Sequence, residues 1–248
     1  FEFALWTLSI IRDLIKRQFG KTLSTATVSK VMRLLGFTVQ RPLYRAWQQD
    51  AVLVETWRKE VFPRIQAEAR QAGATIYFAD EAGLRSDDHR GTTWAPEGET
   101  PVVQATGRRY SLSMISAISA RGDFRFMVHE GTVNATVFRD FLKRLMTGAS
   151  QPIFLVVDGH PIHKAKQVKD FVEAQAGRLK LFFLPPYAPQ LNPDEQVWGN
   201  VKARVSKQLP ETLDELKSRI IGALRRLQKL PEIVKGFFHH PECRYAAA

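Results

Sequence analysis

The chain has 248 residues, of which 44% are hydrophobic, and its formal net charge is +11. This hydrophobic content suffices for a packed core, and because the longest apolar runs have only strand length, we expect a soluble globular protein without a membrane span. A single cysteine, Cys243, excludes an internal disulfide and a cysteine-cluster zinc site, which favours the cytoplasm. The chain opens on Phe1 in the middle of a pattern, so we expect residues upstream in the natural protein.

The positive charge is concentrated at the two ends of the chain. Residues 1–50 hold 8 Lys or Arg against 3 Asp or Glu, and residues 201–248 hold 10 against 5, whereas residues 51–200 are nearly balanced. A basic surface attracts phosphate and releases condensed counterions, so nucleic acid is the leading class of partner. A soluble basic surface without a specific partner is the alternative on charge alone.

The first predicted elements are two short helices joined by a tight turn. Apolar residues recur at three- and four-residue steps from Leu5 to Phe19, and a second helix starts at Ser24 or Thr25 and stops at Gly36. This spacing is typical of a helix-turn-helix, although an ordinary helical hairpin has the same pattern. The side chains that we expect to contact DNA here are Thr27, Lys30 and Arg33 of the second helix and Arg41 and Arg45 of the basic connector after it.

A longer helix and then a set of strands follow. Residues 51–72 predict a helix whose apolar positions are Val54, Trp57, Val61 and Ile65. From Ala74 the apolar period becomes that of strands. The elements expected from there are a strand ending at Asp80, a hairpin of 110–119 and 123–131, a helix at 134–146, an apolar strand ending at Asp158, a helix at 162–174, a strand at 179–185, a helix from about Pro193 and a basic helix at 212–230. This order predicts an α/β fold in which a mixed sheet has helices on both faces.

Three acidic residues stand at the ends of these predicted elements. Asp80 and Asp158 each close an apolar strand, and Glu195 opens a helix after a proline-rich loop. Chemistry in open α/β sheets lies at the carboxyl ends of strands, so these carboxylates are expected to converge. Each has a structural alternative, since Asp80 can cap a turn, Asp158 can accept from backbone amides and Glu195 can complement a helix dipole.

Crowded carboxylates repel one another and stay ionised only with a cation among them. Oxygen ligands favour Mg²⁺ or Mn²⁺, and two such ions suit in-line displacement at phosphorus. Asp80, Asp158 and Glu195 are therefore the predicted catalytic and metal-binding residues.

Three segments around these acids resemble the catalytic blocks of the Tc/mariner superfamily of transposases, in its bacterial insertion-sequence branch. They are FADEAG at 78–83, VVDGHPIHKAK at 156–166 and LPPYAPQLNPDEQVWGNVK at 184–202, and the likeness extends to RGTTWAPEGETP at 90–101. The resemblance implies a five-stranded RNase H-like core with an Asp-Asp-Glu triad, separated here by 78 and 37 residues. It also implies Mg²⁺-dependent cutting at the ends of a mobile element and insertion at a TA target. Of the two N-terminal helical modules usual in that family, one is visible.

Residues beside the triad are interpreted with more restraint. Adjacent residues on a strand face opposite ways, so Glu81 is not expected to be a ligand, and Asp194 is a weaker substitute for Glu195. We expect Trp94 and Trp198 to serve packing rather than base stacking.

Basic side chains near the triad are candidates for DNA contact. His163 and Lys164 are expected to contact phosphate, although a helix-start hydrogen bond explains His163 equally well. Lys202 either lines the DNA path or forms a solvated helix face.

These features together predict a DNA transposase in four segments: a helix-turn-helix and connector at 1–50, a linking helix at 51–72, a catalytic domain at 73–208 and a basic helical segment at 209–248. We expect it to act on element ends and target DNA as a homodimer, in the cytoplasm at the bacterial nucleoid. A nuclease without strand transfer and a catalytically silent DNA-binding regulator are the alternatives.

Overall fold

The computed structural model describes residues 5–40, 46–88, 93–102 and 108–247. Its contacts form two compact units, Phe1–Arg45 and Ala46–Ala248. The segments predicted as a linking helix and as a C-terminal basic segment therefore belong to the same unit as the strands.

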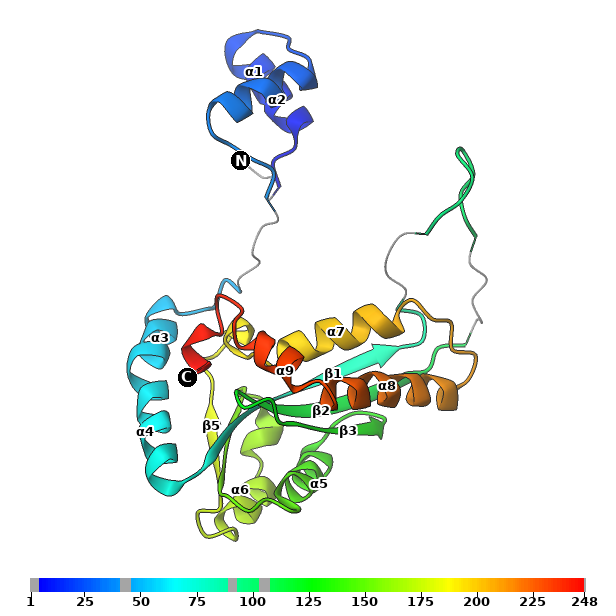
Figure 1. Cartoon of the computed structure of the whole chain (residues 1–248). Coiled ribbons are helices and arrows are strands. Elements are labelled where there is room, and N and C mark those ends of the chain that lie inside the picture. Colours follow the sequence, from blue (N-terminus) through cyan, green and yellow to red (C-terminus); the bar gives the residue numbers. More distant parts are fainter. Residues whose placement is uncertain (1–4, 41–45, 89–92, 103–107, 248) are drawn as a thin grey trace. The chain divides into compact units, whose positions relative to one another are not determined.

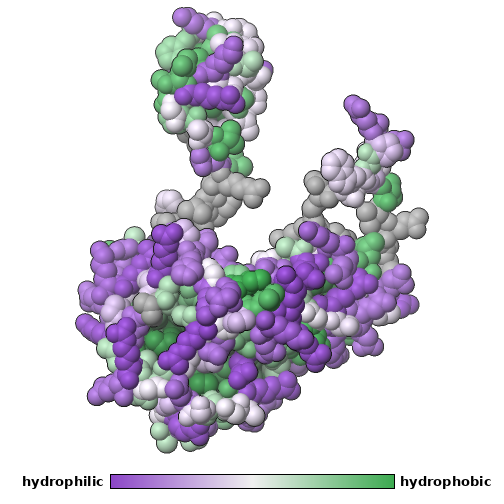
Figure 2. Space-filling view, in the orientation of Figure 1, coloured by the Kyte–Doolittle hydropathy of each residue, from purple (hydrophilic) through white to green (hydrophobic). Residues whose placement is uncertain are grey.

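The first unit contains the two predicted helices, α1 (Leu8–Phe19) and α2 (Thr25–Leu34). The hydroxyl oxygen of Ser24 caps α2 by accepting from the backbone N–H of Thr27 at 3.1 Å, and Gly20 ends α1 with a φ of 66°. Among the described residues of this unit, Val28 is the one that is buried. Hydrophobic side chains are consequently left exposed on it (Figure 2), including Phe19, Leu34, Leu35, Phe37 and Val39.

The second unit begins with the predicted long helix, which is built in three parts: α3 (Ala51–Thr56), a π-helical turn (Trp57–Val61) and α4 (Phe62–Ala72). Pro63 has no backbone N–H to donate, and the π turn lies directly before it, with the backbone N–H of Phe62 donating to the backbone oxygen of Trp57. The wider turn shifts the helix face by one residue. Phe62 is therefore the buried residue, at 1% exposure, and the prediction that Val61 faces the core is wrong, since Val61 is 36% exposed.

The second unit is organised around one five-stranded sheet, in the order β3-β2-β1-β4-β5 (Figure 1). The strands are β1 (Thr75–Arg85), β2 (Ser111–Ser119), β3 (Phe124–Glu130), β4 (Ile153–Val157) and β5 (Leu179–Phe183). The first three are antiparallel neighbours, and a hairpin joins β2 to β3. β4 and β5 run parallel to β1. The predicted mixed five-stranded sheet is confirmed.

Helices cover both faces of this sheet, as predicted (Figure 1). On one face, α5 (Ala135–Met146) and α6 (Lys166–Glu173) pack against alternate strand residues such as Tyr77 and Ala79. The opposite face, which includes Phe78, is covered by α4, α7 (Glu195–Val205), α8 (Leu213–Gln228) and α9 (Pro231–Phe237). The two-residue alternation of a strand thus sends neighbouring side chains into separate cores.

Three predicted boundaries differ from the structure. β1 does not end at Asp80 but pairs with β2 through Arg85. The helix predicted at 162–174 is broken by the extended backbone of Ala165 into a 3-10 turn (Pro161–Lys164) and α6, and the helix predicted at 212–230 ends at Gln228 before α9.

No helix in the described parts of the chain combines the length and apolar character that a membrane crossing requires.

Candidate active site

Asp80 and Asp158 belong to two neighbouring parallel strands: Asp80 lies within β1, and Asp158 directly follows β4. The parallel pairing of β1 with β4 runs as far as Phe78 opposite Val156, and each acid stands two residues further along its strand. Neighbouring strands are about 4.8 Å apart, so the backbone positions of the two acids lie at the same level, near the carboxyl end of β4. β1 continues because β2 supplies its hydrogen bonds there, and this places Asp80 within a strand, where its backbone is held on one side.

The start of α7 is fastened to the same part of β1. Glu195 is the first residue of α7, and the preceding loop is tied down where the side-chain amide of Asn192 donates to the backbone oxygen of Ala79 at 3.0 Å. One turn into the helix, the indole Nε1 of Trp198 donates to Oδ2 of Asp80 at 2.8 Å. These two bonds bring the third acid to the first.

Burial and the charge of another acid raise the pKa of two of the three carboxylates, Asp80 and Glu195. Burial raises the pKa of Asp80 well above its ordinary value, and the charge of Glu195 raises it further, while the bond from Trp198 opposes both. Burial also raises the pKa of Glu195, with Lys202 lowering it and the charge of Asp158 raising it. The charge of Glu195 thus acts on Asp80 and that of Asp158 acts on Glu195, whereas the pKa of Asp158 itself is lowered.

This donor set fits a hard divalent cation. The described residues contain no three Asp, Glu, His or Cys side chains already arranged as a metal site. The three acids nevertheless offer oxygen ligands alone, and their mutual repulsion is the cost that a bound cation would remove.

Asp194, the residue before Glu195, is turned into the protein. Its side chain is fully buried, and its Oδ2 accepts from the hydroxyl of Ser116 on β2 at 2.7 Å. Burial and the charge of Asp80 raise its pKa well above the ordinary value, and within the described structure its Oδ1 has no hydrogen-bond partner. Asp194 is thus a buried neighbour of the cluster.

Comparison with known proteins agrees with this geometry. Residues 75–217 match the family described as DDE superfamily endonuclease, which spans β1 to α8 and includes all three acids. The chain belongs to the DDE superfamily of endonucleases. Residues 2–61 match a second family, the winged helix-turn-helix, which confirms the predicted DNA-binding type of module. A search of curated proteins gave no significant match.

Solved structures show the same architecture as this DDE endonuclease. The Mos1 mariner paired end complex with Mn aligns with a TM-score of 0.64 and 13% identity over 96% of this chain and 78% of that chain. The Mos1 strand transfer complex aligns with a TM-score of 0.60 and 16% identity over 97% and 78%. The catalytic domain of Mos1 mariner transposase aligns with a TM-score of 0.52 and 12% identity over 82% and 98%. The predicted RNase H-like fold is confirmed.

His163 has a different place in the DDE endonuclease from the one predicted. It is 1% exposed, so it is not available for a phosphate contact. Its Nδ1 lies 2.9 Å from Oδ1 of Asp158, and its Nε2 lies 2.9 Å from Oε1 of Glu81. Burial lowers its pKa, but the bonds to the two carboxylates outweigh burial and raise the pKa to about 9. In turn, the bond from His163 is the largest cause of the lowered pKa of Asp158.

The other predicted DNA contacts of the DDE endonuclease fall into three groups. Thr27, Lys30 and Arg33 are exposed on α2, as a DNA-reading face requires, and their role remains a prediction. Lys164 is exposed, with its Nζ 5.2 Å from the ring centre of Phe183, whereas Lys202 is half-buried beside Glu195. Arg41 and Arg45 lie outside the described residues.

The two tryptophans also differ from each other. Trp198 is 3% exposed and packs in the core, as predicted. Trp94 is 99% exposed, so the prediction that it serves packing is wrong for this chain.

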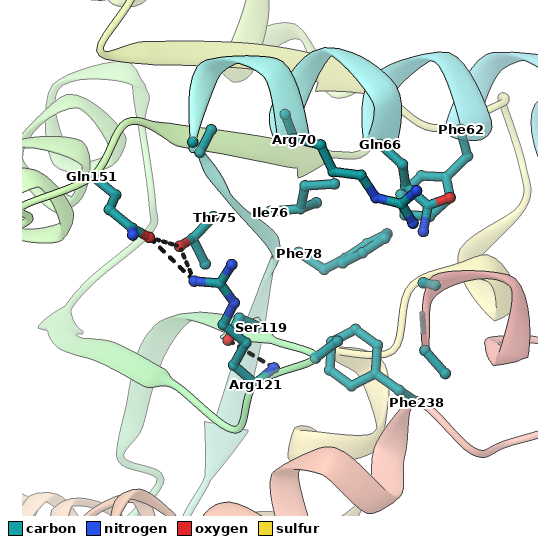
Figure 3. Close-up of a pocket in the computed structure, with 16 residues that line it drawn as sticks. Phe62, Gln66, Arg70, Thr75, Ile76, Phe78, Ser119, Arg121, Gln151 and Phe238 are labelled. Atoms are coloured by element: carbon teal, nitrogen blue, oxygen red, sulfur yellow. Dashed lines mark hydrogen bonds between the residues drawn. The ribbon is translucent and has the colours of Figure 1, made fainter.

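A hollow of about 490 Å³ lies along the N-terminal half of β1, away from the acids (Figure 3). Arg121 crosses its rim and donates to the hydroxyl of Thr75 at 3.2 Å and to the side-chain oxygen of Gln151 at 3.1 Å. Its apolar lining includes Phe62, Ile76, Phe78 and Phe238. None of the three acids lines this hollow, so it is separate from the candidate active site.

The sequence does not indicate the side chains that hold Asp80, Asp194, the loop before Glu195 and His163 in place. They are Trp198, Ser116, Asn192 and Glu81. The alternation along β1 contained part of the signal, since it predicts that Glu81 and Asp80 face opposite cores. The hydrogen-bond partners themselves come from segments that are distant in the sequence, so no local pattern indicates them.

Proposed function

We propose that this DDE endonuclease is a DNA transposase, which cuts strands at the ends of a mobile element and joins them to target DNA. The observation that supports the proposal is the placement of Asp80 in β1, Asp158 directly after the parallel strand β4 and Glu195 at the start of α7, with the charge of Glu195 acting on Asp80 and that of Asp158 on Glu195. Strand cleavage and strand transfer are both phosphoryl transfers, so one acidic centre serves both steps.

The chain's own residues position the reacting groups. Asp80 would present its oxygens from within β1, Asp158 from the residue after β4, and Glu195 from the first turn of α7. Held among them, two Mg²⁺ or Mn²⁺ ions would activate the attacking water or 3′-hydroxyl and stabilise the leaving oxygen. Lys202, whose charge already acts on Glu195, would attract the DNA backbone towards the cluster.

The partner in this proposal is DNA from the element ends and a target with the sequence TA. α2 would enter a groove with Thr27, Lys30 and Arg33, while the basic connector and Lys164 would neutralise phosphates. A homodimer would hold the two ends of the element together, at the nucleoid of a bacterial cell. The division into segments at 1–50, 51–72, 73–208 and 209–248 is part of the same proposal.

The test is a strand-transfer assay. A labelled duplex from the end of the element, with its 3′-hydroxyl already exposed, is incubated with the protein, MgCl₂ and a supercoiled plasmid. The proposal expects labelled plasmid with the parent protein, no labelled plasmid with Asp158→Asn or Glu195→Gln, and unchanged binding of the labelled duplex by both variants. Glu130→Gln, an exposed acid on β3 paired with Lys217 at 2.7 Å, is the matched control and should join DNA at the parent rate.

The alternatives give other results in the same assay. A nuclease without strand transfer nicks the plasmid in a Mg²⁺-dependent way but leaves it unlabelled. A silent DNA-binding regulator retards the labelled duplex and neither nicks nor joins. Joining by Asp158→Asn at the parent rate would refute the assignment of the acidic centre.

A further inference from the structure

Asp158 is restrained less by the sheet than Asp80 is. It follows the last residue of β4, and its side chain is 54% exposed, whereas Asp80 lies inside an 11-residue strand. Within the described residues, the polar contacts of the Asp158 carboxylate involve one oxygen, Oδ1, while Nδ1 of His163 also lies 3.2 Å from the backbone oxygen of Asp158. The backbone N–H of His160 donates to Oδ1 at 3.0 Å, and Nδ1 of His163 lies 2.9 Å from that Oδ1. This arrangement holds one oxygen and leaves Oδ2 for a ligand.

His163 is itself held firmly enough to orient a carboxylate. Its ring is buried at 1% exposure, with its centre 4.4 Å from that of Phe138 on α5. It belongs to the 3-10 turn (Pro161–Lys164) that the extended backbone of Ala165 separates from α6. The break in the helix therefore lets the ring point back under Asp158 while α6 packs on the sheet.

The second ring nitrogen connects this unit to β1. Nε2 of His163 lies 2.9 Å from Oε1 of Glu81, which is the residue after Asp80. Because adjacent strand residues face opposite ways, Glu81 lies on the face covered by α5, and Asp80 lies on the face where Trp198 holds it. Glu81, His163 and Asp158 thus form a chain of contacts that connects β1 with the residue after β4.

We propose that His163 and Glu81 are positioning residues, which fix Oδ1 of Asp158 so that its Oδ2 is presented to a divalent metal ion. The proposal rests on the proposed function of the acidic centre. Buried partners that orient a metal ligand typically change metal affinity 10- to 100-fold when removed. Glu81 is expected to act on Asp158 only through His163, because its contact in the structure is with the imidazole and not with Asp158, while its charge separately raises the pKa of Asp80.

The test measures Mn²⁺ binding to the full chain without DNA, by electron paramagnetic resonance of free Mn²⁺. We expect His163→Ala and Glu81→Ala each to raise the half-saturating Mn²⁺ concentration by roughly 10-fold or more. The double variant should bind Mn²⁺ no more weakly than His163→Ala alone. His163→Asn, whose amide can donate from the position of Nδ1, should recover part of the affinity and should be insensitive to Glu81→Ala. Glu130→Ala is the matched control and should bind as the parent does.

Each result decides between the proposals. Folded single variants that bind Mn²⁺ as tightly as the parent, or effects of His163→Ala and Glu81→Ala that add in the double variant, overturn the positioning role. If His163→Ala does not fold, Glu81→Ala and His163→Asn carry the same comparison. The proposed function fails separately, if the parent protein shows no Mn²⁺ binding that Asp158→Asn removes.

Discussion

The hydrogen bond from Trp198 to Asp80 offers a quantitative test of how the acidic centre is held. The bond is 2.8 Å long and leads to a carboxylate whose pKa is already raised by burial and by Glu195. A hydrogen bond to a charged group contributes about 1.5–3 kcal/mol. Trp198→Phe removes the bond and should raise the pKa of Asp80 further.

A higher pKa of Asp80 should weaken metal binding. A metal ion binds the ionised carboxylate, and a higher pKa leaves less of it at low pH. Trp198→Phe should therefore weaken Mn²⁺ binding by about 10-fold or more at the low end of the pH series, and the loss should shrink as the pH is raised.

The assay is a Mn²⁺ titration of the parent and the variant at several pH values. Trp57→Phe is the matched control, because Trp57 is equally buried at 3% exposure in the same core cluster and is not the donor to Asp80. A loss for Trp198→Phe that is independent of pH, or an equal loss for Trp57→Phe, would refute the reasoning and point to a general loosening of the core.

Three further predictions concern other parts of the chain. Lys30→Ala and Arg33→Ala should each weaken DNA binding and reduce its salt dependence by about one ion, measured by fluorescence anisotropy over a salt series. An unchanged salt slope would remove these residues from the interface. In the protein kept metal-free with EDTA, the folded pKa of His163 is raised from 6.5 to about 9, so its contribution to stability should be complete below the lower value and lost as the pH rises through the higher one. Thermal melts from pH 6 to 10 should show this decline, and His163→Asn should flatten it. Phe62→Ala should lower the free energy of unfolding by about 3–5 kcal/mol in urea titrations, whereas Val61→Ala should cost roughly 1 kcal/mol or less, and the reverse order would contradict the π turn.

Much of the fold was predictable because it depends on local periods and end signals. The change of period at Ala74 and the capping residue Ser24 are properties of short segments, and the structure agrees with both. The π turn before Pro63 escaped prediction, since the period assumed for an α-helix places Val61 and not Phe62 on the buried face. The strand boundary at Asp80 was wrong for a related reason, because a charged residue looks like a strand end until a neighbouring strand is known to pair beyond it.

The sequence by itself predicted which residues would carry the proposed chemistry, since acids directly after apolar runs and an acid at a helix start are expected to meet at one end of the sheet. Only the tertiary structure decided how those carboxylates are held. Trp198 reaches Asp80 from 118 residues away, and His163 meets Glu81 from 82 residues away. Hydrogen bonds across such separations depend on how helices and strands pack, and a local pattern contains no record of them.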